Sequence, residues 1–585
     1  MISLSLLLGL LGLVPVASGV ILLLGARALS RLAAAIWCGV VLLFSLIGVL
    51  FLIRLLSYGD TIQSTAFAPA GWASWLQLSY QVDSFNIFGA LVVGVLASAV
   101  AAVLIAFELP PAEPPGQSAW WNHTGQMGVL LIALGAVFTA IFANSALWMV
   151  VGWALAGLCA FTFAARGEAR KRAIVLLATP CLAAIILYLS LLPALATRAD
   201  QRLDVLAGLG REPFWAACIM LAALLAPATM LLTQQATSAH GPGITTMSRS
   251  AVYMLMAAPV TFTVLARLAL LVAGPGEVAP GSGSLGWRAF SLVIVWASAA
   301  LALAAALAAL RTAHRATLPV FLSIQLLSWM FAGVGISGTA ALNGALLLKL
   351  LRLLALGALL LAGTRKPTQA ILNSSWWLAA LSLSVLPFSA GFSSAWLVTS
   401  GAVAAGPAWV AGIGFNWLAL LVVTLAIVRA SGIGEAPAEE APHASAANQV
   451  ELLPNFLLLL LALLALALGI APEVAVNFFT SPAANSLPVL ANQAPGAGVQ
   501  TNPLGFVSAV GTWTPGLVWL LALLLLLLCY ILTRHTRQPA SVPSFLGGEA
   551  EVALTDDTIA LSPPRAGQPR EPERSREGES STKPE

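Results

Sequence analysis

The sequence predicts an all-α, polytopic membrane protein. Hydrophobic residues make up 59% of the 585 residues and charged residues 9%, and the mean hydropathy of +0.93 lies outside the range of soluble domains. The apolar runs continue for about 20 residues, the length that a helix needs to cross a hydrocarbon layer about 30 Å thick. Because apolar and polar residues do not alternate within these runs, the runs predict helices rather than barrel strands.

About fifteen such runs follow one another, each long enough for one membrane span. The first run is interpreted as a retained helix rather than a signal peptide, because Met1-Ile2-Ser3 has no basic residue and a second run follows at once. The expected spans are residues 3–25, 32–56, 84–107, 126–143, 145–165, 173–195, 213–233, 248–272, 289–310, 316–337, 340–362, 375–399, 406–429, 452–471 and 515–533.

The basic residues between the spans predict the orientation of the chain. Cytoplasmic loops are enriched in Lys and Arg, and the loops after odd-numbered spans hold most of these residues here. The N-terminus is therefore expected outside the plasma membrane and the C-terminus in the cytoplasm. The main exceptions, on the side with few cations, are Arg198, Arg202, Arg211, Arg267 and Arg288.

The composition changes after the last span. Residues 534–585 are rich in Pro, Ser, Glu and Arg and have few large apolar side chains. Such a segment cannot bury enough apolar surface to offset the entropy of ordering. We therefore expect a transmembrane helical bundle over residues 1–533 and a disordered cytoplasmic tail over residues 534–585.

Residues typical of soluble catalytic sites are nearly absent. The five cysteines lie inside apolar runs without CxxC spacing, and no phosphate-binding glycine loop, carboxylate pair or histidine cluster occurs. The sequence therefore predicts no catalytic residues, no cofactor and no metal site. The net charge of +4 comes from cations at membrane edges, so nucleic acid is not an expected partner.

Four segments occur in an order that resembles a known family. They are YQVDSF at 80–85, ANSALWMVVGWALAGL at 143–158, SAHGP at 238–242 and LPFSAGFSSA at 386–395. Together they resemble motifs of the antiporter-like membrane subunits of respiratory complex I, membrane-bound hydrogenases and multisubunit sodium/proton antiporters. The resemblance implies an antiporter-like bundle with discontinuous helices near 233–243 and 387–394, where Pro interrupts helical hydrogen bonding.

The chain departs from that family where the family moves protons. The resemblance implies a Glu in the fifth helix, a Lys in the seventh, and a Lys or Glu in the twelfth. The matching positions here are Ala154, Ala226 and Ala395. An alanine cannot ionise, so the usual proton path has no relay group at these positions. The chain is therefore expected to be a degenerate member.

Two pairs of cations are candidates for a remaining ion pathway. Lys349 and Arg352 lie near the middle of the eleventh span at helical spacing i and i+3. His314 and Arg315 open the tenth span. The alternative for the first pair is a shifted span, or pairing with a neighbouring subunit or a lipid phosphate. The alternative for the second is an ordinary cytoplasmic flank.

Three functions follow from these observations. The first is a membrane subunit of an NADH-quinone oxidoreductase or antiporter-type complex that is degenerate in its proton path and so structural or regulatory. The second is an active proton- or cation-translocating subunit that uses Lys349 and Arg352. The third is an unrelated secondary transporter. The expected partners are the lipid bilayer and other membrane subunits, and any enzymatic role would belong to the complex.

Overall fold

The structure is a computed structural model of the chain. It describes residues 4–56, 62–65, 78–106, 123–164, 184–189, 191, 203, 262–270, 285–312, 318–359, 370–387, 389–430, 452–487, 499–502, 505–508 and 510–536.

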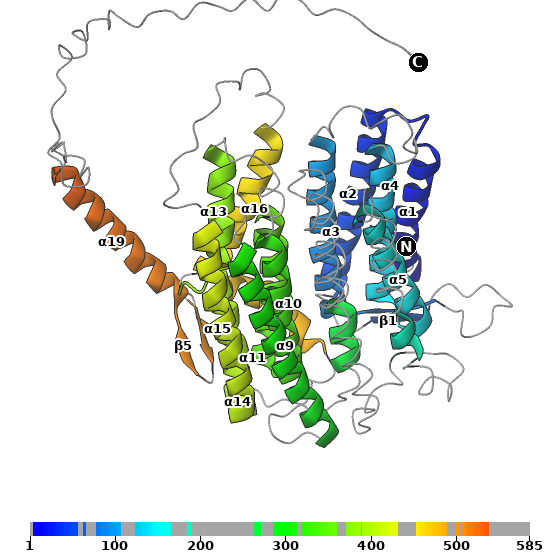
Figure 1. Cartoon of the computed structure of the whole chain (residues 1–585). Coiled ribbons are helices and arrows are strands. Elements are labelled where there is room, and N and C mark those ends of the chain that lie inside the picture. The colour runs from blue at the N-terminus through cyan, green and yellow to red at the C-terminus, as the bar shows by residue number, and fades with distance from the viewer. Residues whose placement is uncertain are drawn as a thin grey trace, which may run out of the picture. The chain divides into compact units, whose positions relative to one another are not determined.

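The N-terminal part of the described chain is a group of long helices that run side by side (Figure 1). Helix α1 packs closely along α4, because glycines of the two helices face each other. A Cβ atom on Gly19 would collide with the carbonyl oxygen of Gly128, and small residues at such contacts let membrane helices approach. The helices are α1 (Leu4–Leu24), α2 (Arg31–Leu56), α3 (Ser84–Ala106), α4 (His123–Phe142) and α5 (Ala146–Ala164).

A second group of helices surrounds α10. Every residue of α10 is buried, and α9, α11, α14 and α15 pack against it. Helix α11 continues into the π-helix η5 without a break. The elements are α9 (Leu285–Thr312), α10 (Leu318–Ile336), α11 (Thr339–Leu351), η5 (Arg352–Leu356), α13 (Ala370–Ser382), α14 (Ala390–Ala405), α15 (Pro407–Ala430) and α16 (Leu452–Ile470).

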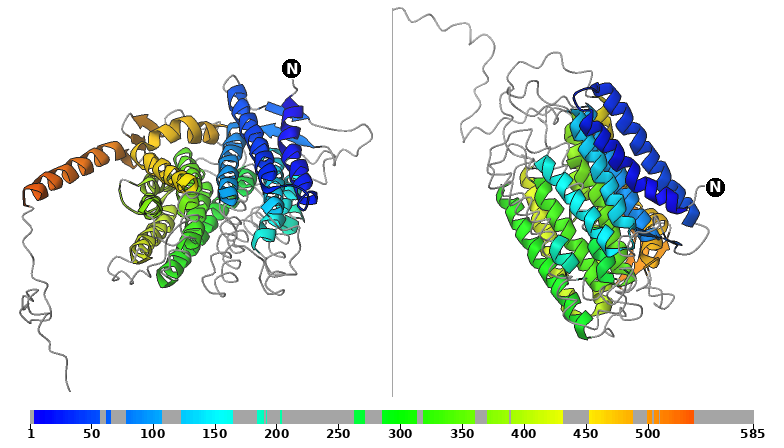
Figure 2. Two further views of the ribbon diagram at one scale, coloured as in Figure 1. Left: turned by 90° about the horizontal axis from the view of Figure 1, so that it is seen from above. Right: turned by 90° about the vertical axis from the view of Figure 1, so that its right-hand side faces the viewer.

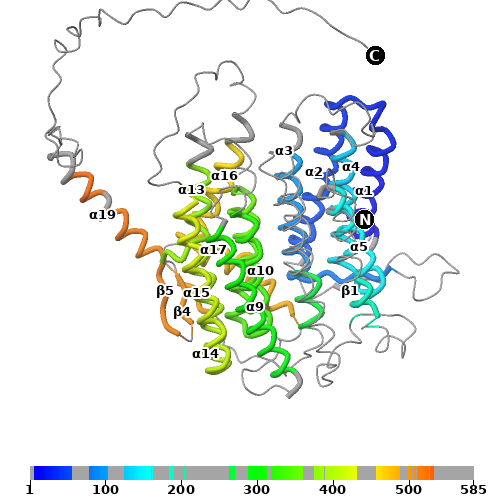
Figure 3. The backbone as a smooth tube through the Cα atoms, in the orientation of Figure 1, coloured from blue at the N-terminus to red at the C-terminus, as the bar shows by residue number. Residues whose placement is uncertain are grey.

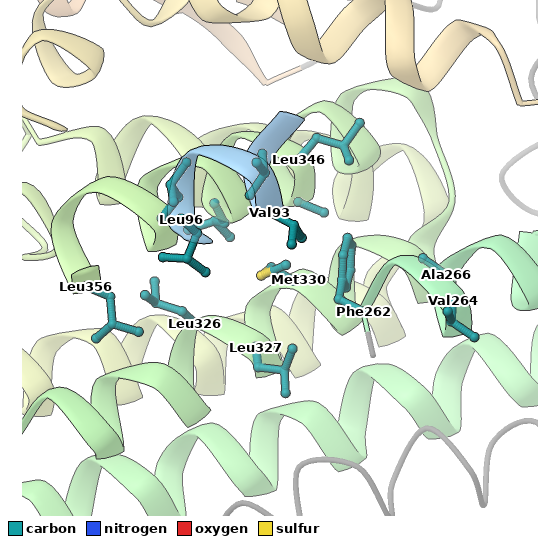
Figure 4. Packing of buried hydrophobic residues seen from close by; sticks show 14 of the residues in the cluster. Val93, Leu96, Phe262, Val264, Ala266, Leu326, Leu327, Met330, Leu346 and Leu356 are labelled. Carbon is teal, nitrogen blue, oxygen red and sulfur yellow. The ribbon is translucent and has the colours of Figure 1, made fainter. Parts of the chain in front are cut away.

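An apolar core joins the two groups. Figure 4 shows Val93 of α3 near Phe262, Met330 of α10 and Leu346 of α11. Phe262 belongs to the short described helical stretch 262–270. All these side chains belong to one buried cluster. Side chains of α3, α10, α11 and residues 262–270 therefore share one core.

The polytopic helical fold is confirmed in the described residues. They contain eight helices long and apolar enough to cross a membrane, or nine if a bent pair is one span. Of the expected span 173–195 only 184–189 and 191 are described, and of the span 248–272 only 262–270. The expected span 213–233 lies outside the described residues. A count of fifteen therefore stays a prediction.

The expected break near 387–394 is present but begins earlier. Helix α13 ends at Ser382 and α14 begins at Ala390, so Pro387 lies in the gap. The hydroxyl of Ser389 accepts a hydrogen bond from the Phe392 N–H and caps α14. The other expected break, near 233–243, lies outside the described residues.

A third interruption was not predicted from the sequence. After α16 the chain turns by 96° at Ala471, because Pro472 cannot continue the helix, and the new direction can be followed in Figure 3. The turned segment consists of α17 (Pro472–Ala475), the π-helix η6 (Val476–Thr480) and α18 (Ser481–Asn485). It lies against α11 and the start of α3.

Two small antiparallel sheets supplement the helices, where the sequence predicted helices alone. In the first, Ile62 pairs with Val82; in the second, Phe506 of the central strand pairs with Trp513. The strands are β1 (Ile62–Thr65), β2 (Ser79–Val82), β3 (Gln500–Asn502), β4 (Gly505–Ser508) and β5 (Gly511–Trp513).

Both sheets adjoin the same set of helix ends, which we call the strand end of the bundle. Tyr80 of β2 forms a bridge with Ala143 after α4, and the Ser486 hydroxyl after α18 accepts from the Phe85 N–H at the start of α3. Strand β4 in turn contacts α17. Figure 2 shows the helices from two further directions.

The last described helix is α19 (Pro515–Thr536). The chain divides into two compact units, Met1–Leu521 and Ala522–Glu585, and the division falls within α19. The composition predicted a boundary later in the chain, after residue 533. The side chains of α19 between Leu520 and Ile531 are largely exposed and apolar, as for a helix in lipid. Of the expected tail, residues 534–536 belong to α19, and residues 537–585 lie outside the described residues.

Candidate functional site

Lys349 lies in the interior of the bundle inside an aromatic cage. Its side chain is 1% exposed, and its Nζ donates to the Thr263 hydroxyl at 2.6 Å. The ring centres of Phe85, Phe88 and Phe262 lie 5.9, 5.5 and 5.7 Å from Nζ. Aromatic faces carry partial negative charge and attract an ammonium group at this range. The cage therefore supplies the electrostatic attraction that a carboxylate would otherwise give.

Three elements build this cage. Phe85 and Phe88 lie one turn apart in the first two turns of α3, and Phe262 and Thr263 come from the stretch 262–270. Gly89 of α3 leaves room for the ammonium, since a Cβ atom there would lie 3.2 Å from Nζ. The cage thus depends on a short local spacing of aromatics and one small residue.

Arg352 points to a different neighbour. It is 2% exposed and donates from Nη2 to the Ser323 hydroxyl of α10 at 2.5 Å. Arg352 is also the first residue of the π-helix η5, and π-turns within α-helices frequently mark functional sites. Both cations are thus buried beside a hydroxyl group, Lys349 beside Thr263 and Arg352 beside Ser323. A role for either cation in an ion pathway stays a prediction.

Carboxylates are scarce in the described residues. Among them, Asp83 and Glu473 alone carry one, and both lie at the strand end of the bundle. In the part of the chain that the structure describes, no group of three His, Cys, Asp or Glu residues could hold a metal ion. The contacts of the buried Lys349 in the described residues are therefore a hydroxyl and aromatic rings rather than a carboxylate.

Asp83 is the centre of a buried polar network at the strand end. Its side chain caps α3 by accepting from the Asn86 N–H at 2.7 Å. Gln81 donates to the same carboxylate and accepts from Arg267 Nη2 at 2.9 Å. Burial raises the pKa of the Asp83 carboxyl, while the charge of Arg267 and hydrogen bonds from Asn86, Phe85 and Gln81 oppose the rise.

Arg267 itself caps the end of α4. Its Nη1 donates to the Ala143 carbonyl at 2.6 Å and to the Ile141 carbonyl at 3.2 Å, where the negative end of a helix favours a cation. Arg267 was an exception to the charge pattern of the loops, and its hydrogen bonds at the end of α4 account for a cation at this place. Because its charge is buried in this network, it does not act as a topological signal.

The expected proton-relay positions are apolar where the structure describes them. Ala154 is partly buried on α5, and Ala395 is 1% exposed on α14. Neither methyl group can bind a proton. Ala226, His314 and Arg315 lie outside the described residues, so their places in the bundle stay predictions.

The cage and the Asp83 network were not predicted from the sequence. The spacing of Phe85 and Phe88 is typical of any buried helix face, and Thr263 is an isolated hydroxyl in an apolar run. A usable signal was Asp83 followed three residues later by Asn86, since this spacing suits a helix cap. Contacts between residues far apart in the chain, such as Thr263 with Lys349, left no local pattern.

No protein-family model matches the sequence, and no functionally curated protein matches it significantly. Solved structures do match its fold. A chain of the Mrp complex from Dietzia sp. DQ12-45-1b aligns with a TM-score of 0.63 and 16% identity, covering 82% of this chain and 97% of that one.

Two respiratory complexes match similarly. A chain of the archaeal membrane-bound sulfane sulfur reductase aligns with a TM-score of 0.70 and 16% identity, covering 93% of this chain and 87% of that one. A chain of respiratory complex I from Thermus thermophilus aligns with a TM-score of 0.61 and 18% identity, covering 82% of this chain and 99% of that one. This chain therefore shares its fold with chains of these three complexes.

Proposed function

We propose that the chain is an antiporter-like subunit of a multi-subunit membrane complex and that it has a structural or regulatory role without proton transfer along the usual family path. The observation that carries the proposal is the replacement of relay groups by Ala154 and Ala395, together with a caged Lys349 that has no carboxylate partner in the described helices. The fold supports the first half of the proposal.

The physical reason lies in what a relay requires. A proton crosses the membrane interior by binding to groups whose pKa changes as a nearby charge forms or disappears. An aromatic ring and a threonine hydroxyl hold an ammonium group, but their own charge does not switch in this way. Water that would bridge relays also needs several polar partners, which methyl groups do not provide.

The proposal is tested with the purified chain in proteoliposomes. A pH gradient should decay no faster than in empty vesicles prepared from the same lipid. The double variant Ala154→Glu with Ala226→Lys restores the acid and base of the family path, and its proton flux provides a positive comparison. Flux above the empty-vesicle rate from the unchanged chain would contradict the proposal.

A second candidate is an active subunit that uses Lys349 and Arg352. The π-helix that begins at Arg352 favours it, since such turns are common at functional sites. In this case the unchanged chain conducts protons and Lys349→Met abolishes the conduction. The third hypothesis, an unrelated secondary transporter, finds no support in the fold comparisons.

We further propose the orientation with the N-terminus outside and the C-terminus in the cytoplasm of the plasma membrane. The basic residues of the loops after odd-numbered spans support it, and contacts between helix ends support the span count on which it rests. Near the start of both helices, Trp409 of α15 donates from Nε1 to the Ser291 hydroxyl of α9. Near their ends, Arg429 of α15 donates from Nη1 to the Leu310 carbonyl of α9. These two helices are thus parallel, as the thirteenth and ninth spans of the expected count should be. A C-terminal tag should be cleaved by protease in inverted vesicles and protected in intact spheroplasts.

The proposed partners are other membrane subunits of such a complex. Affinity purification in mild detergent, followed by mass spectrometry, should recover further polytopic membrane proteins in stoichiometric amounts. Recovery of this chain alone would argue against a scaffold role.

A further inference from the structure

The second sheet contacts the first turns of α14, directly after the break between α13 and α14. Trp513 of β5 donates from Nε1 to the Ser393 hydroxyl at 3.3 Å, in the first turn of α14. Its ring centre lies 4.8 Å from that of Phe392 and 5.6 Å from that of Trp396. Ring pairs at these distances attract each other beyond their burial. Strand β5 is thus attached to the start of α14 by one side chain.

The neighbouring strand is attached at a second place. Phe506 of β4, the residue paired with Trp513, is fully buried against Leu347 of α11 and Leu397 of α14. Residues opposite each other on antiparallel strands share one face of the sheet. One face of the β3–β5 sheet therefore lies on two helices at once.

Aromatic rings continue from the sheet into the bundle. Phe392 lies 5.1 Å from Trp417 of α15, and Trp417 lies 5.8 Å from Trp329 of the enclosed helix α10. The Trp417 Nε1 donates to the Thr399 hydroxyl at 2.8 Å. The row includes Phe392, three residues before Ala395, the position that corresponds to the twelfth-helix relay of the family.

We propose that the β3–β5 sheet is a lid, with Trp513 as its latch, that closes the strand end of the broken α13–α14 helix to water. Interrupted backbone is tolerated in a membrane protein where protein covers it, and the sheet provides this cover. The lid goes beyond the proposed function, because it would close this end whether or not the chain conducts protons elsewhere.

The lid is built to open without unfolding the bundle. Its strands are three or four residues long, and a sheet of this size has little stability apart from what it packs on. The contacts of Trp513 and Phe506 therefore hold most of it in place. Local opening of such a unit takes less free energy than global unfolding.

Thiol labelling of the full-length chain tests the lid. In a background with all five native cysteines replaced, Ser393→Cys is treated in lipid nanodiscs with a charged methanethiosulfonate, which does not enter the apolar interior. Gln500→Cys on exposed β3 serves as the reference for an accessible site. Ser393 is fully buried, so its cysteine should react at least about tenfold more slowly than the reference if labelling requires opening. Equal rates would overturn the proposal.

The latch is tested by adding Trp513→Ala to the Ser393→Cys chain. Removal of both ring contacts should accelerate labelling by about tenfold or more. The matched control is Trp296→Ala, which removes a half-exposed tryptophan of α9 that contacts Phe415 away from the lid, and it should leave the rate unchanged. Unchanged labelling in Trp513→Ala, or equal acceleration by both variants, would overturn the role of Trp513. Neither measurement depends on proton flux.

Discussion

Lys349 shows how a cation can lie inside a membrane bundle without an acid beside it. Three phenylalanine rings and one hydroxyl surround its ammonium group. A buried charge is costly, and contacts with rings return part of that cost. Because the gain and the cost oppose each other, the net effect of the charge on the free energy of unfolding is small, and its contacts with the rings are better measured by a coupling energy.

A double-mutant cycle measures the cage. Lys349→Met keeps the length of the side chain and removes the charge, and it should change the free energy of unfolding by less than about 1 kcal/mol. Phe88→Leu should cost more in the unchanged chain than in the Lys349→Met variant, by a coupling of about 0.5–2 kcal/mol. Denaturation in mild detergent, followed by tryptophan fluorescence, gives all four values. A coupling of zero would mean that the ring and the ammonium do not interact.

Asp83 acts at the start of α3 and is buried near Arg267. Asp83→Ala removes the cap and the negative charge, and by analogy with broken buried pairs it should lower the free energy of unfolding by about 3 kcal/mol or more. Asp83→Asn should cost about 1–2 kcal/mol, since its amide oxygen still caps the helix. The same denaturation measurement compares them. Equal losses would show that the cap, which only the Asn variant keeps, contributes nothing.

Single helices were predicted well where local rules apply. The break between α13 and α14 was predicted from Pro387, because a proline acts within a few residues of the chain. The Ser389 cap that starts α14 became evident only in the structure. The 96° turn at Ala471 was missed although Pro472 was visible, since nothing local shows that the chain afterwards lies across α11. The π-helix at Arg352 was missed because its sequence, RLLAL, equally suits an α-helix.

The contact between α1 and α4 should be sensitive to side-chain volume. Gly128→Leu places a side chain against the backbone of α1 and should destabilise the protein by about 1–3 kcal/mol. On α2, a Cβ atom added to Gly39 would meet no other atom within 4 Å, so Gly39→Leu should stay within about 0.5 kcal/mol of the unchanged chain. Thermal unfolding in detergent tests the pair. A larger loss for the α2 variant would contradict the packing described.

At the scale of the whole molecule, composition alone predicted the membrane bundle, and four ordered motifs predicted its family resemblance. The candidate site was predicted in part. Lys349 and Arg352 stood out because charges are rare in apolar runs. Their hydrogen-bond partners lie 86 and 29 residues away in the chain, where no periodicity connects them to the two cations.

The tail gives a prediction for the entire chain. Removal of residues 538–585 should leave the thermal unfolding temperature of the bundle unchanged, because a segment of this composition does not form a packed core. Limited proteolysis should remove it first and leave the bundle intact. A lower unfolding temperature for the shortened chain would show that the tail packs on the bundle.

The complete enclosure of α10 has a consequence for biosynthesis. This helix is the least apolar of the candidate spans, with a mean hydropathy of 1.6, and it carries Ser323, Gln325 and Ser328 on buried faces. Two of the helices that cover it, α14 and α15, end at Ala405 and Ala430. At about 5–20 residues per second, the ribosome needs several seconds or more to reach that point after α10 is made. During this interval α10 must remain beside the insertion machinery or expose its polar groups to lipid.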